Sequence, residues 1–378
     1  MTPAKPSLGL LRSLTDEHVL RALIAERRLT RAEIAARTGI SKPTIGDSVR
    51  RLAEGGLVRD TGERTTGPGR IGTYYALAAD LGAALVVGIA PEGVVAEVVD
   101  VYGDVVAREA EPVERPARPA QVARTLRSVA TRVLSGGPGR IRLAVVSAAD
   151  PVDRGSGRLV HLPDAPFLVG ELSAVDVLAP VVAGPVTVDN DVNWAARAER
   201  ADADPGTLDD FGYLYLGEGL GCAVVADGEV RRGHGGLSGE ISQVITTGPA
   251  GRAVRFTQVF EELGLHRPGS TAIDADALLR AVGDHDDHGS PGILDALAEA
   301  IAGVLAALIA LTDPRLVILG GTWGPDPAVL RAATQALARQ PRSVPLQVAK
   351  IIDEPALAGA RQRGVHDLRA LLTQGAPA

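Results

Sequence analysis

Two different spacings of hydrophobic residues divide this chain of 378 residues. Before residue 80, apolar side chains recur every three or four positions, which predicts short helices with one buried face. After residue 83, compact apolar runs bounded by Gly and Pro alternate with longer helical stretches, which is typical of an α/β fold. The change predicts an N-terminal domain over residues 1–80 and a second domain over residues 81–378.

Capping signals place two helices close together in the N-terminal domain. Thr30 and Glu33 form a capping box at the start of a helix over Arg31–Arg37, because the side chain of each can bond the backbone of the other. Gly39 supplies a turn that needs a positive φ, and Ser41 caps the helix that follows. Two short helices joined by such a turn are the layout of a helix-turn-helix.

The helix after Ser41 has an apolar side and a polar side. Ile45, Val49 and Leu52 share one side at i, i+4 and i+7, so we expect them to be buried. The opposite side would enter a major groove and reach bases or phosphates. The residues expected to contact DNA from this helix are Lys42, Pro43, Thr44, Gly46, Asp47, Arg50 and Arg51.

A basic hairpin follows this helix and completes the pattern of a winged helix-turn-helix. Its first strand begins at Leu57, its second strand covers Thr73–Leu77, and the turn Gly67–Arg70 lies between them. We expect Arg64 to contact DNA and Arg70 to enter a narrow minor groove. The alternatives are a protein-binding winged helix and an ordinary surface turn.

The net charges of the two domains differ in sign. Residues 1–80 contain 13 Lys or Arg and 9 Asp or Glu, a balance of +4, and residues 81–378 contain 26 and 37, a balance of −11, which together give the net charge of −7. A basic domain attached to an acidic one favours contact of a single surface with phosphates. We therefore expect double-stranded operator DNA as a partner.

The composition excludes several classes of protein. A single cysteine, Cys222, excludes an internal disulfide and a Cys-rich zinc site. The longest apolar run, Ile301–Leu311, is too short to cross a bilayer, and the first residues lack the apolar core of a secretory signal. We therefore expect a cytoplasmic protein with no membrane partner.

The second domain contains a series of motifs in a fixed order. The first is the acidic segment Asp189–Asn193, and the second is the Gly-rich hairpin Leu216–Gly221. The third is Gly233–Glu240, which ends with an acidic residue, and the last is Asp313–Gly321, a strand that ends in two glycines. In this order the motifs resemble those of the ROK family, named for its repressors, open reading frames and sugar kinases. The pattern at Leu29–Ala35 resembles the head of the repressor branch, so the resemblance covers nearly all of the chain.

The resemblance implies a particular α/β architecture. Behind the winged helix-turn-helix it implies a two-lobed, actin-like and ribonuclease-H-like body of the sugar-kinase type. One lobe would consist of residues 81–188 with the C-terminal end of the chain, and the other lobe of residues 189–310.

The resemblance also implies a sugar site. Its expected ligand-binding residues are Asn190, Asp191 and Glu240, with Asp164 and Phe167 in a loop over the sugar. Carboxylates suit sugars because each can accept two hydroxyl protons, and the Asn amide both donates and accepts. The alternative is a polar turn whose only role is to cap the helix that follows.

Several features depart from the kinases of the family. The turn that holds phosphate and metal in those kinases corresponds to Ala90–Val94, which has no hydroxyl and loses a backbone donor at Pro91. Glu240 is followed by Ser242 and Gln243 instead of a zinc-ligating His, and residues 246–256 contain no Cys. We therefore expect no ATP use, no catalytic residue, no metal and no cofactor, and so a protein that is not an enzyme.

These observations predict a DNA-binding transcriptional regulator, a repressor of sugar-metabolism genes, whose body senses a carbohydrate or sugar phosphate. We expect a homodimer or homotetramer, because one small head rarely supplies the contacts that operator affinity needs. Two alternatives stay open: a ligand-independent regulator whose body is a dimerisation scaffold, and a sugar kinase with an accessory head. The sequence leaves the sugar, the operator and the sign of regulation open.

Overall fold

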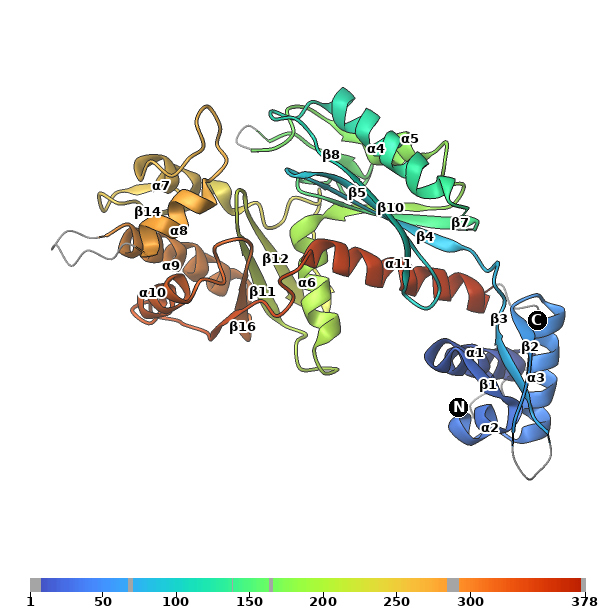
Figure 1. Ribbon diagram of the computed structural model, residues 1–378. Helices are drawn as coiled ribbons and strands as arrows, with labels where there is room; N and C mark the ends of the chain where they lie inside the picture. Colours follow the sequence, from blue (N-terminus) through green and yellow to red (C-terminus); the bar gives the residue numbers. More distant parts are fainter. Residues whose placement is uncertain (1–7, 67–70, 138, 163–165, 284–291, 375–378) are drawn as a thin grey trace.

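The protein has a small N-terminal head and a larger body made of two lobes, as Figure 1 shows for the computed structural model. Two of the expected contact residues, Arg70 and Asp164, lie outside the described residues. The structure describes residues 8–66, 71–137, 139–162, 166–283 and 292–374.

The head is a set of helices packed on a small antiparallel sheet. Its elements are α1 Leu8–Glu26, β1 Arg28–Thr30, α2 Arg31–Thr38, α3 Lys42–Glu54, β2 Val58–Arg64 and β3 Thr73–Leu77, with the strand order β1-β3-β2. Thr30 Oγ1 accepts from the Glu33 amide at 3.3 Å and Glu33 Oε2 accepts from the Thr30 amide at 2.7 Å, which confirms the capping box. Gly39 has a φ of 70°, so the turn needs the glycine there.

The first lobe is built on a mixed sheet of order β10-β7-β4-β5-β6. Its elements are β4 Ala83–Ala90, β5 Gly93–Val99, β6 Val105–Glu111, α4 Pro119–Ser135, β7 Ile141–Ala148, β8 Arg158–Leu159, β9 Leu172–Ser173, α5 Ala174–Leu178, β10 Val186–Asn190 and α11 Pro355–Gln374. Leu85 and Val87 of β4 pack in the layer of α4 and α5, whereas Ala84 and Val86 pack in the layer of α11. The central strand is therefore apolar on both sides, which explains its unbroken hydrophobic run.

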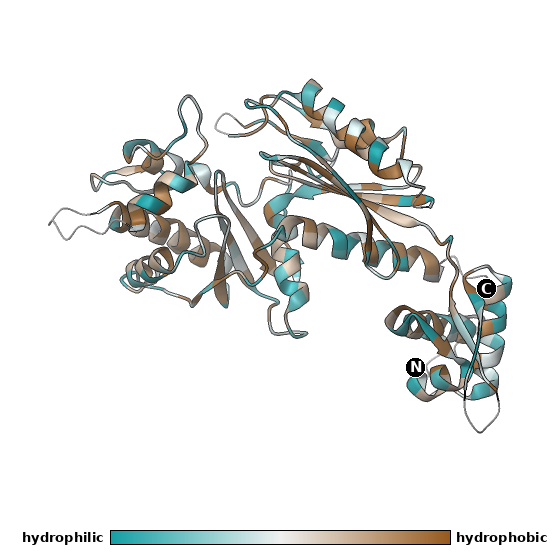
Figure 2. Cartoon of the chain, viewed as in Figure 1, coloured by the Kyte–Doolittle hydropathy of each residue, from teal (hydrophilic) through white to brown (hydrophobic). Residues whose placement is uncertain are grey.

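The second lobe has a sheet of order β13-β12-β11-β16-β17. Its elements are α6 Asp191–Asp202, β11 Phe211–Leu216, β12 Leu220–Ala226, β13 Glu229–Val230, η1 Ile241–Gln243, β14 Ile245–Thr247, β15 Ala253–Arg255, α7 Phe256–Glu262, α8 Ala275–Gly283, α9 Ile293–Thr312, β16 Leu316–Gly320, α10 Pro327–Leu337 and β17 Leu346–Val348. Leu214 and Leu216 face the layer of α7 and α9, and Phe211 and Tyr213 face α6. Figure 2 shows the hydrophobic residues gathered along the strands of both sheets.

The predicted end of the second lobe at residue 310 is too early. β16 pairs in parallel with β11, and β17 pairs in parallel with β16, so the chain stays in the second sheet as far as Val348. The reason is that α9 is the crossover that a parallel pair requires, and the strand after it must therefore belong to the same lobe.

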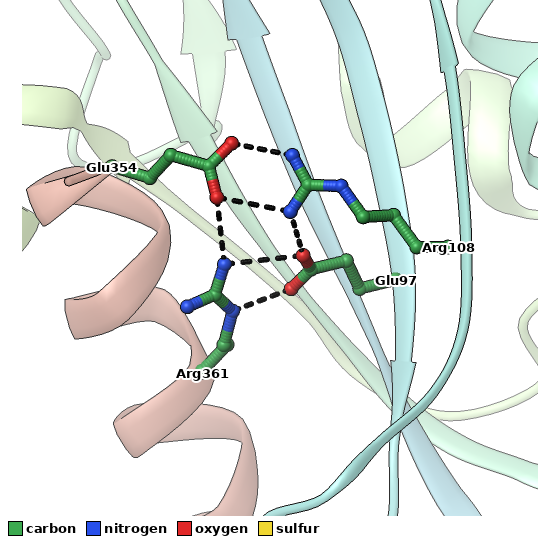
Figure 3. Close-up of polar contacts among 4 residues, drawn as sticks. All are labelled: Glu97, Arg108, Glu354 and Arg361. Atoms are coloured by element: carbon green, nitrogen blue, oxygen red, sulfur yellow. Dashed lines mark hydrogen bonds and ion pairs between the residues drawn. The ribbon is translucent and has the colours of Figure 1, made fainter.

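The C-terminal helix α11 returns to the first lobe, as expected, and extends toward the head (Figure 1). An ionic network fastens it to the sheet (Figure 3): Glu97 of β5 is 0% exposed and contacts Arg108 of β6 and Arg361 of α11. Glu354 completes the network, 3.0 Å from Arg361. Gly359 lets α11 approach α6 closely, because a Cβ there would lie 2.0 Å from the Trp194 carbonyl oxygen.

Helix α9 has the length and composition that a membrane span would need, with a mean hydropathy of 2.1 over its apolar window. The helix begins before the apolar run Ile301–Leu311, which alone is too short to cross a bilayer. In the structure 56% of that window is buried, and Thr246 of β14 donates a hydrogen bond to the Ala300 carbonyl at 2.7 Å. Its apolar residues form the core of the second lobe.

Candidate functional site

The outward side of α3 is the candidate nucleic-acid surface. Ile45, Val49 and Leu52 are buried against the rest of the head, as predicted. Their burial turns the opposite side of the helix to the solvent. The residues on that side that are exposed or partly exposed are Lys42, Pro43, Thr44, Gly46, Asp47 and Arg50.

Two of the expected DNA-contacting arginines form ion pairs that are exposed to solvent. Arg50 lies 3.1 Å from Asp47 and 3.9 Å from Glu54, and on the wing Arg64 lies 3.0 Å from Asp60. Pairs between exposed side chains contribute little stability, because water screens them. Both guanidinium groups can therefore exchange a carboxylate for a phosphate or a base edge at small cost.

Arg51 differs from the expectation for this surface. Its guanidinium lies 2.6 Å from Asp16 of α1, whose side chain is 4% exposed, and Ser48 donates to the same carboxylate. The helical spacing put Arg51 on the polar side of α3, but the buried carboxylate of Asp16 on α1 draws its guanidinium inward. We therefore remove Arg51 from the set of proposed DNA contacts and assign it to the packing of α1 against α3.

A cavity of about 450 Å³ lies between the two lobes of the body. On the first-lobe side it is lined by residues that follow β4, β7 and β10, because the carboxyl ends of these parallel strands meet at one edge of the sheet. On the second-lobe side it is lined by the β11–β12 hairpin and by the chain around η1. Phe167, expected in a loop over the sugar, is buried and also lines the cavity.

The cavity brings together Asn190, Asp191 and Glu240, which were expected to bind the ligand. Asn190 is also the N-cap of α6: its Oδ1 accepts from the Val192 amide at 3.0 Å. Its amide group donates to the carbonyls of Ala148 and Asp150, 3.4 and 3.3 Å away. Asn190 therefore caps α6 and also lines the cavity, and its hydrogen bonds hold the motif in place at the cavity wall.

Asp189 anchors the same motif from behind. It is 2% exposed and lies 2.7 Å from Arg197 and 3.1 Å from Arg232, and it accepts from the Asn193 amide group at 2.9 Å. A buried carboxylate with this many cationic and hydrogen-bonding partners is electrically satisfied. Asp189 therefore fixes the start of α6 and leaves Asp191 as the acidic residue that faces the cavity.

Asp150 is a site residue that the sequence analysis did not find. It is 1% exposed, its Oδ1 accepts from the Leu168 amide at 3.4 Å, and its Oδ2 has no hydrogen-bond partner among the described residues. It lies between Ala149 and Pro151, which both line the cavity. The available signal was its position directly after the buried strand β7.

The acidic groups of the cavity have raised pKa values. Burial, and then the charges of Asp191 and Glu240, raise the pKa of Asp150 to about 7. Burial, and then the charge of Glu92, raise the pKa of Asp191 to about 7, and burial followed by the charge of Asp191 does the same for the pKa of Glu240. Near neutral pH these carboxyl groups therefore share protons as a coupled set.

Two carboxylates lie on the loops that resemble the phosphate-binding loops of the family's kinases. Glu92 is exposed at the β4–β5 turn, directly after Pro91, and lines the cavity. Glu218 of the β11–β12 hairpin lies 2.6 Å from Arg115 of the first lobe and 2.6 Å from Arg267. Both guanidinium groups thus pair with the carboxylate of Glu218 and are not available to a phosphate. The pair with Arg115 also joins the two lobes across the cavity.

Metal ligation has no clear geometry here. Within the part of the chain that the structure describes, no group of three His, Cys, Asp or Glu side chains could hold a metal ion. The carboxylates of the cavity are thus too dispersed to form one coordination sphere. Cys222 is buried on β12, and burial raises the pKa of its thiol to about 12, as expected for a small core residue.

Sequence profiles agree with this division into head and body. The profile of the ROK family matches residues 92–362, and that of the winged helix-turn-helix DNA-binding domains matches residues 12–59. The chain belongs to the ROK family. Its N-terminal winged helix-turn-helix and its two-lobed sugar-kinase-like body confirm the predicted fold class.

Known proteins similar to this ROK protein include both enzymes and a regulator. The bifunctional enzyme NanE/NanK of Brucella melitensis biotype 1 is 30% identical over 164 residues, which are 42% of this chain and only 31% of that enzyme. N-acetylmannosamine kinase of Escherichia coli O1:K1 / APEC is 29% identical over 261 residues, 66% of this chain and 81% of the kinase. The crystal structure of a ROK family transcriptional regulator, a homolog of the E. coli MLC protein, covers 96% of this chain and 99% of its own, with a TM-score of 0.66 and 16% identity. That last likeness extends the shared fold over head and body together.

Proposed function

We propose that this ROK protein is a transcriptional repressor of sugar-metabolism genes that binds operator DNA through α3 and the wing and releases it when the cavity binds a carbohydrate. One observation carries the proposal: an exposed polar and basic helix side and an acidic cavity between lobes occur in one chain, joined by packed helices. The regulator with a similar fold over nearly all of this chain supports the same reading.

The two sites are connected through helices α6 and α11. α6 begins at the cavity with Asp191 and packs along α11, and α11 contacts α1 of the head. A second contact between head and body joins Arg27 to Asp104, 2.7 Å apart, and stacks Arg27 over the ring of Tyr102 at 4.8 Å. A ligand that binds one arrangement of the lobes better by about 1–3 kcal/mol would shift the equilibrium toward that arrangement. The heads would then take the positions that belong to it.

The cavity favours binding over phosphoryl transfer. A nucleoside triphosphate needs backbone donors and cations around its phosphates, whereas this cavity offers Pro91 and the carboxylate of Glu92 at one loop and a neutralised Glu218 at the other. Asp191 would then accept hydrogen bonds from a sugar hydroxyl without passing its proton to a reaction. The ligand is thus sensed and not consumed, and the protein is not an enzyme.

The proposal includes an assembly and a place in the cell. Two heads of a homodimer, or of a homotetramer, would bind two half-sites, because a single small head supplies too few contacts for operator affinity. We place the protein in the cytoplasm, where its DNA partner would be.

The experiment that tests this function is a gel shift on the DNA upstream of the protein's own gene, with and without a library of sugars. We expect a retarded band at low salt that a particular sugar removes. The same sugar should raise the melting temperature of the protein, because a ligand that binds only the folded state stabilises it. The Asp191→Asn variant should bind DNA normally and respond more weakly to the sugar.

Three outcomes would contradict parts of the proposal. A melting temperature that no sugar changes, with DNA binding intact, would show that the body is a ligand-independent scaffold. Release of ADP with a hexose, abolished in Asp191→Asn, would show a kinase, as in the enzymes with similar sequence. Arg50→Ala should weaken DNA binding by about 1–3 kcal/mol, and unchanged affinity would show that α3 is not the contact surface.

A further inference from the structure

The lining of the cavity is strongly biased toward negative charge. Its acidic members are Glu92, Asp191, Glu218 and Glu240, and the only cation among the described lining residues is Arg255, which is exposed. Glu218 is already neutralised by two arginines. The charge that faces the cavity without a partner cation therefore comes from Glu92, Asp191 and Glu240.

Asp150, next to the cavity lining, is a further carboxylate that is not fully satisfied. Its side chain is 1% exposed, yet Oδ2 has no hydrogen-bond partner among the described residues. Leaving a buried carboxylate oxygen without a donor is costly, so such an atom needs an explanation. Asp150 is coupled electrostatically to Asp191 and Glu240 across the cavity wall. A positive charge that enters the cavity would therefore also lower the electrostatic cost of a charged Asp150.

We propose that the effector is an aminated sugar, whose protonated amine pairs with the carboxylate of Asp191 while the charges of Glu92 and Glu240 attract it from the two lobes. An ammonium group needs only one close carboxylate, and the charges of others can act on it from a longer distance, whereas a metal ion needs several ligands in one coordination sphere. A sugar phosphate has the opposite charge, so the same carboxylates would repel it and weaken its binding. This inference rests on the proposed carbohydrate-binding role of the cavity and specifies the chemistry of its ligand.

Glu92 is the residue that gives the cavity this selectivity. It comes from the first lobe, at the turn after β4, and its charge acts on Asp191 at the start of α6. A metal ion is a poorer occupant, because no group of three His, Cys, Asp or Glu side chains in the described ranges could ligate one. The raised pKa values of Asp191 and Glu240 are consistent with carboxyl groups that are buried without a neighbouring cation.

The test compares matched sugars by isothermal titration calorimetry with the full-length protein. The probes are hexoses with a free amine at the 2-, 3- or 6-position, each beside its hydroxyl parent and its N-acetyl derivative, together with hexose 6-phosphates. We expect at least one free amine to bind at least about ten-fold more tightly than both of its neutral counterparts. Its binding should release protons, seen as a heat that depends on the ionisation enthalpy of the buffer.

Two variants and one control sharpen the result. Glu92→Gln keeps the size of an exposed turn residue and should bring the affinity of the amine within about three-fold of its hydroxyl parent, since one of its charges is lost. Glu229→Gln, an exposed position on β13 outside the cavity lining, should keep the ten-fold preference. Near-UV circular dichroism of each variant checks that the fold is retained.

The outcomes separate this inference from the function on which it rests. A neutral sugar or a sugar phosphate that binds as tightly as every amine would overturn the aminated ligand and leave carbohydrate sensing intact. Failure of all sugars to bind would overturn both. Magnesium or calcium chloride that raises the melting temperature as much as the amine would assign the carboxylates to a metal instead.

Discussion

Asp16 in the head and Asp150 at the cavity are both almost inaccessible to solvent, with exposures of 3% and 1%. Asp16 receives Ser48 and the guanidinium of Arg51, whereas one oxygen of Asp150 has no hydrogen-bond partner in the described chain. The body also contains a fully paired buried carboxylate, because Glu97 is held by two arginines (Figure 3). The protein thus pairs buried carboxylates in both domains, whereas Asp150, Asp191 and Glu240 have no salt-bridge partner among the described residues.

The difference separates charges that stabilise the fold from charges that are kept for a ligand. Removing one partner of a buried ion pair leaves an unpaired charge and destabilises the fold. Buried carboxylates without a cation already have this unfavourable desolvation energy, so replacing one by a neutral residue should stabilise the fold. Sites held at a cost in stability are typical of binding and catalytic centres. The two regions should therefore respond to substitution with opposite signs.

The largest effect is expected in the head. Arg51→Ala should lower the free energy of unfolding of the head by about 3–5 kcal/mol, because Asp16 stays buried with only Ser48 as a partner. Hydrogen exchange of the amides of α1 and α3 measures this loss. Arg50→Ala removes the same charge from an exposed site and should change stability by less than about 1 kcal/mol. Equal effects of the two variants would refute the assignment of Arg51 to packing.

A smaller loss is expected where α11 meets the first lobe. Arg361→Ala should lower the free energy of unfolding of the body by about 2–3 kcal/mol, because Glu97 keeps Arg108 as its remaining partner. Chemical denaturation followed by Trp fluorescence measures the change, since Trp194 packs beside this layer. Arg363→Ala, which removes an exposed pair on the same helix, serves as the control. No difference between the two variants would mean that the network contributes nothing to the body.

The cavity should respond in the opposite direction, and with a dependence on pH. The pKa values of Asp150, Asp191 and Glu240 are raised to about 7, so these groups bind protons more tightly in the folded than in the unfolded state. The stability of the body should therefore fall as pH rises from about 4 to about 7 and then level off. Asp191→Asn should flatten this fall and stabilise the body by about 1 kcal/mol at pH 8.

Melting temperatures recorded from pH 4 to pH 9 test the sign of this effect. Glu229→Gln, at an exposed position of the same lobe, should leave the profile unchanged. A body that becomes more stable between pH 5 and pH 7, or an Asp191→Asn variant that is less stable at pH 8, would show that the cavity carboxylates are already paired.

The smallest effect concerns the DNA surface. Gly46 lies inside α3, and an added Cβ would meet no atom within 4 Å. Gly46→Ala should therefore stabilise the head by about 1 kcal/mol. If the backbone of α3 approaches the groove closely, the same methyl group should weaken DNA binding, as measured by fluorescence anisotropy. The gain in stability serves as the internal control for folding, and unchanged affinity would place Gly46 away from the DNA.

The head was predictable because its signals are local. Thr30 and Glu33 are three residues apart, Gly39 marks the turn, and the second wing strand has the predicted bounds. The sequence could not reveal that Arg51 meets Asp16, because 35 residues and a change of helix separate the two. Spacing along one helix predicts the direction of a side chain, but it does not predict which residue of another helix that side chain contacts.

The cavity was predictable only in part. Asn190, Asp191 and Glu240 were found through motifs that resemble a family, and the cavity joins them. Asp150 belongs to no such motif and reaches the others only through the parallel pairing of β7 with β10. The β6 strand, Val105–Glu111, was not expected either. Long-range pairing of strands leaves no mark within a short stretch of sequence.

The absence of a side chain at Gly359 has a mechanical consequence. No atom can be inserted between the backbone of α11 and the Trp194 carbonyl, so the two helices touch without slack. If α6 tilts when something occupies its first turn, the tilt cannot be absorbed by repacking at that crossing. The displacement would then pass along α11, a helix of 20 residues that also contacts α1 of the head.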